Sequence, residues 1–137
     1  MAIRLLIISS RKAGLSPEEF REHYKNHASL IKRLAGDTFP LSHRRTYIAR
    51  TNTPTPPTGA TSRNPTTPAS VLRGVQAQFD FDATAELTFE SQSAYDRFVA
   101  RVQQPDVAAQ ISADEERFQE TSTVGIAMVD DVTDTVR

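Results

Sequence analysis

Three histidines are the residues of this sequence best suited to proton chemistry near neutral pH, and all lie in its first third: His23, His27 and His43. The chain contains no cysteine, which excludes disulfides, thiolate nucleophiles, iron–sulfur clusters and cysteine zinc sites. Proton transfer must therefore come from these imidazoles, or from carboxyl and phenol groups with displaced pKa values. The absence of cysteine also fits a reducing compartment, so we expect a cytoplasmic protein.

His27 lies on the apolar stripe of an expected helix. The stripe recurs at steps of three and four residues along the chain: Phe20, Tyr24, His27, Ile31 and Leu34. One interpretation is a core histidine bonded to a backbone carbonyl. The other is a general acid or base at the mouth of a pocket between helix and sheet, where burial would shift its pKa into a useful range.

A zinc site is the second chemistry that the histidines allow. His23 precedes His27 by four residues, so both rings can lie on adjacent turns, and His43 would supply a third nitrogen. However, Glu22 precedes His23 instead of following it, so the zinc-protease pattern is missing. His23 also lies off the centre of the apolar stripe. We therefore expect no metal site.

The segment 42–47 opens a second strand and places His43, Arg45 and Tyr47 on one face. An imidazole, a guanidinium and a phenol together can polarise a carbonyl or stabilise an enolate. The alternative is an edge strand whose charges block aggregation. Glu86 alternates with the apolar face of a later strand, where it is a solvated residue, an ion-pair partner of an arginine or a proton acceptor.

These candidates must be positioned by a small set of elements. We expect strands over 3–9, 45–50, 83–89 and 124–129, and helices over about 17–35, 91–102 and 105–118. The acidic run 114–116 is expected on a solvated helix face. This order predicts an α+β fold, ferredoxin-like β-α-β-β-α-β, with helices on one face of a largely antiparallel sheet. Because 3–9 is apolar on both faces apart from Arg4, we expect a homodimer joined sheet to sheet.

Length and composition limit the remaining possibilities. With 137 residues we expect one domain over 1–137, a Thr/Pro-rich insertion loop over 51–70, which is either functional or a spacer, and a flexible tail over 130–137. The formal net charge of −1 disfavours nucleic-acid and anionic-membrane partners. The longest apolar run, 5–8, is too short for a bilayer span or a signal peptide. Glycine-rich phosphate loops and serine nucleophile elbows are missing.

The segment 15–28, LSPEEFREHYKNHA, resembles the signature of the EthD family, which reads s-x-E-x-F-x-x-Y/W-x-x-x-H-A-P-L after a first apolar strand. The fungal branch of that family is similar at 42–48, at 79–80 with 85–89, and at 114–118. The resemblance spans most of the chain except the insertion and the tail. The family's proline is replaced here by Ser29.

The resemblance implies a dimeric α+β barrel. It also implies a role in polyketide pathways, where fungal members act without metal or organic cofactor as decarboxylases or dehydratases. Related dimeric barrels catalyse cyclisation, hydroxynitrile cleavage or cofactor-free oxygenation of anthrones. The helix histidine of the family maps onto His27, and the histidine that opens the second strand maps onto His43.

We therefore predict a cofactor-independent lyase, a dehydratase or decarboxylase, that acts on a small aromatic or polyketide-derived intermediate of secondary metabolism. His27 is the predicted general acid or base, and His43 is its partner. The predicted substrate-binding residues are Tyr24, Arg45, Tyr47, Phe20, Phe81, Glu86, Phe89 and Phe98. A cyclase or pericyclase, a cofactor-free monooxygenase and a non-catalytic metabolite-binding protein are the alternatives.

Overall fold

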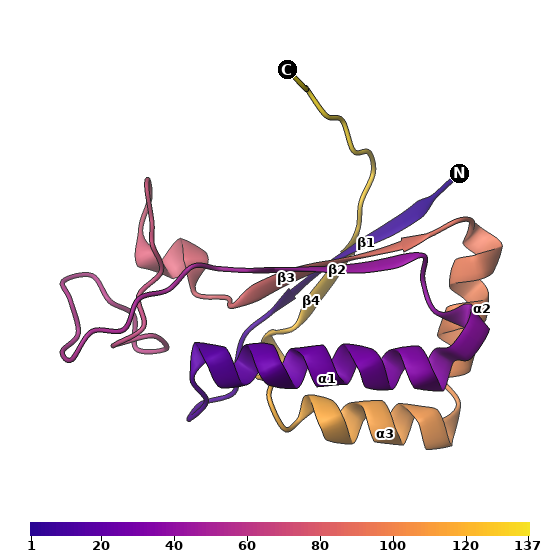
Figure 1. Cartoon of the computed structure of the whole chain (residues 1–137), viewed down its shortest axis with the longest axis horizontal. Helices are drawn as coiled ribbons and strands as arrows, with labels where there is room; N and C mark the ends of the chain where they lie inside the picture. The colour runs from indigo at the N-terminus through magenta and orange to yellow at the C-terminus, as the bar shows by residue number, and fades with distance from the viewer.

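The computed structural model describes residues 1–137 and shows three helices on one face of a four-stranded sheet (Figure 1). The strands are β1 (Ile3–Ser9), β2 (Ser42–Tyr47), β3 (Ala83–Phe89) and β4 (Gly125–Met128). The helices are α1 (Pro17–Ala35), α2 (Gln92–Val102) and α3 (Pro105–Glu115), with short 3₁₀ turns η1 (Gly36–Thr38), η2 (Gln76–Phe79) and η3 (Thr121–Thr123). The sheet order is β2-β3-β1-β4 and every pair is antiparallel. This is the predicted ferredoxin-like α+β fold.

Strand alternation separates the two faces of the sheet. In β3 every second residue, beginning at Ala83, is buried beneath the helices, as the alternating pattern predicts. On the opposite face Leu6 and Ile8 are 38% and 37% exposed, and Figure 1 shows no helix on that side of the sheet. One face of the sheet therefore packs against the helices, and the other is open.

Local sequence signals fix the start of each helix. Ser16 caps α1 through a capping box with Glu19, and Pro17 occupies the first turn. Gly36 ends this helix in a backbone conformation with positive φ, which glycine adopts without strain. Ser91 caps α2, and Pro105 starts α3. These starts confirm the predicted ones.

Two predicted boundaries are wrong. The second strand covers Ser42–Tyr47 instead of 45–50, because its register with β3 pairs Ser42 with Thr88 at one end and Tyr47 with Ala83 at the other. The last helix ends at Glu115, three residues before Phe118, whose backbone then pairs with Lys12. Both changes concern residues of the candidate site.

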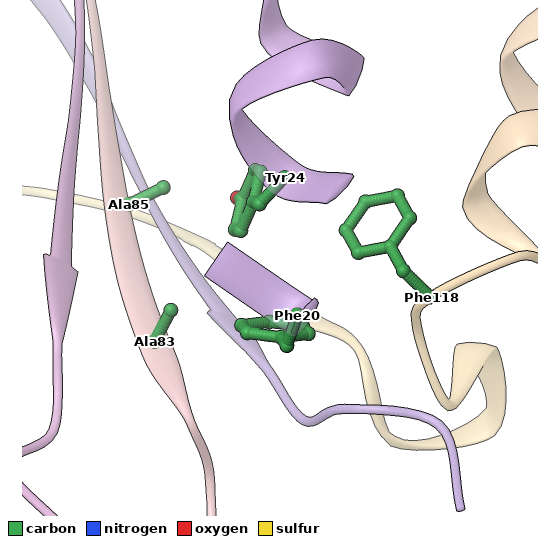
Figure 2. Close-up of a cluster of buried hydrophobic side chains, with 5 residues drawn as sticks. All are labelled: Phe20, Tyr24, Ala83, Ala85 and Phe118. Atoms are coloured by element: carbon green, nitrogen blue, oxygen red, sulfur yellow. The ribbon is translucent and has the colours of Figure 1, made fainter. Parts of the chain in front are cut away.

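The main core cluster joins α1 to β3 and to the turn after α3. Phe118 points at Phe20 and Tyr24 from the α3 side, while Ala83 and Ala85 provide a flat floor on β3 (Figure 2). The ring centroids of Phe118 lie 5.7 Å from Phe20 and 5.5 Å from Tyr24. This packing fixes the height of α1 above the sheet.

Residues 51–70 form an irregular segment that projects beyond the end of the sheet, on the left of Figure 1. It is attached through a buried ionic cluster at its base. The carboxylate of Asp82 accepts hydrogen bonds from Arg11 and, at 3.0 Å, from Arg50. Arg50 also donates to the carbonyl of Thr67 at 3.0 Å, and Asn64 is buried within the segment. Polar bonds therefore hold this stretch to the fold in place of apolar packing.

None of the helices has the length and apolar composition that a bilayer crossing requires.

Candidate active site

His27 lies in the space between α1, α3 and the sheet, where its side chain is almost completely enclosed. The residue is 2% exposed. The apolar stripe of α1 turns it inward, and its ring centroid lies 5.1 Å from that of Phe118 and 6.4 Å from that of Tyr24. The geometry favours the second of the two interpretations, because the ring bonds to a side chain and borders a cavity.

Two carboxylates of α3 face the ring of His27. Its Nδ1 lies 2.7 Å from Oδ2 of Asp114, and its Nε2 lies 3.8 Å from Oε1 of Glu115. An ionised carboxylate only accepts hydrogen bonds, so the short contact places a proton on Nδ1. In the neutral ring Nε2 then carries the free lone pair. Asp114 thus orients the imidazole and leaves Nε2 available as a base.

Glu115 lies opposite Nε2 at a distance too long for a direct hydrogen bond. Burial raises the pKa of its carboxyl group, and the charge of Asp114 raises it further, whereas His27 lowers it when the imidazole is protonated. A carboxyl group with a raised pKa is suited to hold and release a proton closer to neutral pH. His27 and Glu115 therefore form a pair that can accept and donate protons at one place.

The pair borders a cavity of about 100 Å³. Its polar lining comes from five side chains: Tyr24, His27, His43, Glu115 and Gln119. The other eight lining residues are apolar: Ile7, Ile31, Phe39, Pro40, Leu87, Phe98, Val124 and Ile126. A mostly apolar hollow with a few convergent polar groups is the usual form of a small-molecule site. An apolar cavity of about 150 Å³ holds benzene. This cavity is smaller, so an aromatic ring would fill it and extend beyond it.

His43 reaches the cavity from β2. Its ring lies 5.9 Å from the ring of Tyr24, and neither ring nitrogen has a hydrogen-bond partner although both are buried. Burial and, to a smaller extent, the positive charges of Arg45 and His27 together lower the pKa of His43 to about 4. The imidazole is therefore neutral at pH 7, with one N–H donor and one acceptor free to bond a ligand.

Two phenols and a guanidinium lie beside the two histidines. Burial raises the pKa of Tyr24 to about 12, so its hydroxyl stays protonated. Arg45 donates from Nε to the hydroxyl of Tyr47 at 3.2 Å, and its guanidinium lies 5.7 Å from the ring of Tyr24. Only Tyr24 of these three lines the cavity. Arg45 and Tyr47 share the face of His43, as the strand pattern predicts, and support the site from outside.

In addition to Arg45 and Tyr47, four of the proposed substrate-binding residues do not line the cavity. Phe20 belongs to the main core cluster, and Phe89 packs with Leu5 and Leu87 in a second one. Phe81 packs against Phe79 beside the insertion. Glu86 lies on the open face of the sheet, 4.0 Å from Arg4. Of the proposed phenylalanines, Phe98 alone lines the cavity.

His23 and Ser29 also lie outside the cavity. The ring of His23 stacks on Phe118, with centroids 6.2 Å apart and planes inclined by 4°. No group of three or more potential metal ligands is close enough to bind one ion. Ser29, which replaces the family's proline, is exposed, and α1 continues through it without a break.

Asp114, Glu115 and Gln119 are functional candidates that the sequence analysis did not assign to the site. The expectation that the acidic run 114–116 is a solvated helix face is wrong for the first two. The signal lay in the helix register, because Val107, Ile111, Asp114 and Phe118 follow one another at steps of four, three and four residues. That spacing places Asp114 on the apolar stripe of α3 and turns its carboxylate toward α1.

Several solved structures share this fold. The At3g17210 protein of Arabidopsis thaliana matches with a TM-score of 0.56 and 16% identity, over 98% of this chain and 99% of that one. An ethyl tert-butyl ether D (EthD) family protein of Bacillus halodurans matches with a TM-score of 0.54 and 14% identity, over 96% and 100%. A variant of SnoaB, a cofactor-independent oxygenase from Streptomyces nogalater, matches with a TM-score of 0.50 and 14% identity, over 97% and 95%.

Sequence comparison gives the family. No curated protein matches the chain. The model of the EthD domain, however, matches residues 12–122, which include α1 with His27, β2 with His43 and α3 with both carboxylates. This match shows that the chain belongs to the EthD family.

Proposed function

We propose that this protein is a cofactor-independent lyase of secondary metabolism, a dehydratase or decarboxylase that acts on an aromatic or polyketide-derived intermediate. The observation that supports this most strongly is the hydrogen bond of 2.7 Å between His27 Nδ1 and Asp114, which leaves Nε2 free beside the cavity. The resemblance of residues 42–48, 79–80, 85–89 and 114–118 to the fungal branch of the family supports the polyketide assignment.

The site contains the groups that a dehydration needs. Nε2 of His27 removes a proton from the carbon next to a carbonyl, and the C–H electron pair forms an enolate. The neutral His43 donates a hydrogen bond to the enolate oxygen. When the carbonyl re-forms, the β-carbon–oxygen bond breaks, and the departing oxygen takes a proton from the imidazolium or from Glu115 and leaves as water. Asp114 stabilises the imidazolium between the two steps.

Decarboxylation uses the same groups in a different order. The carboxyl proton of a β-keto acid passes to Nε2 of His27, carbon dioxide leaves, and the electron pair of the broken C–C bond forms an enolate. His43 stabilises that enolate, and the imidazolium of His27 returns one proton to carbon. Either reaction requires one base, one acid and one oxyanion donor, all of which border the cavity.

Cofactor-free oxygenation is a second candidate. SnoaB, whose fold this chain shares, is a cofactor-independent oxygenase. Oxygen consumption separates the two candidates, because a lyase uses none and an oxygenase uses one molecule of oxygen per turnover.

A homodimer is part of the proposal. Leu6 and Ile8 on the open sheet face would be buried against a second copy, and Glu86, the strand partner of Leu6, would enter that contact together with Arg4. Light scattering of the purified protein should give twice the mass of one chain, whereas a monomer would contradict this part of the proposal.

A deletion strain and the purified protein together test the function. The strain lacking this protein should accumulate one aromatic intermediate, and the pure protein should convert it. A product lighter by one water or one carbon dioxide supports the lyase and identifies the reaction. A product that has gained oxygen supports the second candidate, and an intermediate that is bound but not converted contradicts both.

A further inference from the structure

A second hollow, which we call the basic groove, lies on the surface between α1 and β2. It has a volume of about 300 Å³ and is bordered by Lys25, Ser29 and Lys32 on α1 and by Ser42 and Arg45 on β2. The three helix residues lie at steps of four and three, so one face of α1 presents two ammonium groups and a hydroxyl. The β2 edge of the sheet adds a guanidinium and a second hydroxyl.

The cations of the basic groove are not neutralised by the protein. Lys25 and Lys32 form no ion pair and no side-chain hydrogen bond, and Arg45 bonds only to the hydroxyl of Tyr47. The groove lining contains no carboxylate. Unlike the arginines of the buried ionic cluster, these three positive charges are therefore free to bind an anion from solution.

The basic groove lies next to the catalytic cavity. The two hollows adjoin each other, because the imidazole of His43 and the phenyl ring of Phe39 line both of them. The cavity of about 100 Å³ is filled by one aromatic ring, whereas small-molecule sites usually measure about 300–1,000 Å³. A larger substrate must extend beyond the cavity, and the basic groove is a neighbouring space that can receive it.

We infer that the basic groove binds an anionic group, a carboxylate or a phosphate, on a substrate whose aromatic part occupies the cavity beside His27. The inference rests on the proposed function and narrows its substrate class to aromatic acids. It also bears on the reaction. A carboxylate held by three cations is stabilised in its ionised ground state and is retained, so the reaction is dehydration, or loss of a different carboxyl group.

Binding of small probes tests the inference without knowledge of the natural substrate. The probes are 3-phenylpropionate, its neutral amide, and phenethyl phosphate, titrated into ¹⁵N-labelled protein by NMR. The wild-type protein should bind the carboxylate or the phosphate about tenfold more tightly than the amide. This preference should shrink as salt rises toward about 1 M, where the Debye length is about 3 Å. The tighter anion of the two identifies the group that the groove accepts.

Charge-removal variants locate the effect. The double variant Lys25→Gln/Lys32→Gln should lose the preference for the anion and bind the amide as the wild type does. Arg33→Gln is the matched control, because Arg33 is an exposed cation of the same helix that does not line the groove. It should bind all three probes as the wild type does.

The outcomes separate the inference from the proposed function. Equal binding of acid and amide by the wild type overturns the inference and leaves the proposed function intact. An anion preference that survives in the double variant overturns it as well. If none of the probes shifts the NMR signals of residues around His27, the inference and the proposed function are both overturned, because the aromatic site would then be missing.

Discussion

Replacement of His43 should change how the stability of the protein depends on pH. Burial, with the positive charges of Arg45 and His27, lowers the pKa of this imidazole from 6.5 to about 4. Between these values the unfolded chain binds a proton that the folded chain does not, so the free energy of unfolding falls as the pH falls. The loss begins near the unfolded pKa and is complete below the folded one.

The size of the effect follows from the two pKa values. Each unit of difference between the unfolded and folded pKa values corresponds to about 1.4 kcal/mol. The change from pH 7 to pH 5 covers more than half of the pH range between 6.5 and about 4. Protonation of the unfolded chain at His43 should therefore remove about 2 kcal/mol from the stability of the wild type over that range. In His43→Gln this contribution is absent.

Urea unfolding at pH 7 and pH 5 measures the effect in both proteins. Other titrating groups, including Glu115, contribute to both, so the difference between the two pH responses isolates His43. Ser42→Ala is the control, because it alters the same strand without removing a titrating group. If wild type and His43→Gln lose equal free energy, His43 is not held neutral by its surroundings and the reasoning on the cavity fails.

Three further substitutions test other parts of the structure. Asp114→Asn should lower kcat about 10²-fold while KM changes little, because the amide orients His27 less well and does not stabilise its charged form; steady-state kinetics on the natural substrate measures this. Phe118→Ala should destabilise the fold by about 3–5 kcal/mol, since Phe118 is fully buried against Phe20 and Tyr24. Urea unfolding measures this loss, which would be smaller if the neighbouring side chains collapsed into the cavity left by the phenyl ring. Asp82→Asn should cost about 3–5 kcal/mol because it leaves Arg11 and Arg50 without their shared carboxylate, and an unchanged Tm would refute that role.

The layout of the fold followed from local patterns in the sequence. The alternation of β3, the capping box at Ser16 and the proline that starts α3 each have a local physical cause, so their positions were predictable. The bounds of β2 were not, because Ser42 and His43 carry no strong strand preference and their place is set by pairing with β3.

The candidate site was predictable only in part. His27 was recognisable because one helix carries both its apolar stripe and the family motif. Asp114 and Glu115 meet His27 from a helix more than 80 residues away in the chain, and a run of acidic residues by itself resembles a solvated surface. Phe20 and Phe89 were placed in the pocket because aromatic residues suit both cores and pockets, and only tertiary packing separates the two.

The central claim is that His27 transfers the proton in the catalytic cavity. The most direct test compares turnover of wild type, His27→Gln and His23→Gln on the intermediate that accumulates in the deletion strain. General acid–base catalysis contributes about 10²–10⁴-fold to the rate, so the turnover of His27→Gln should fall by at least about 10²-fold. The Tm of the variant should show that it remains folded. His23→Gln, one turn earlier on the same helix and outside the cavity, should turn over as the wild type does. Turnover by His27→Gln at the wild-type rate would contradict the claim.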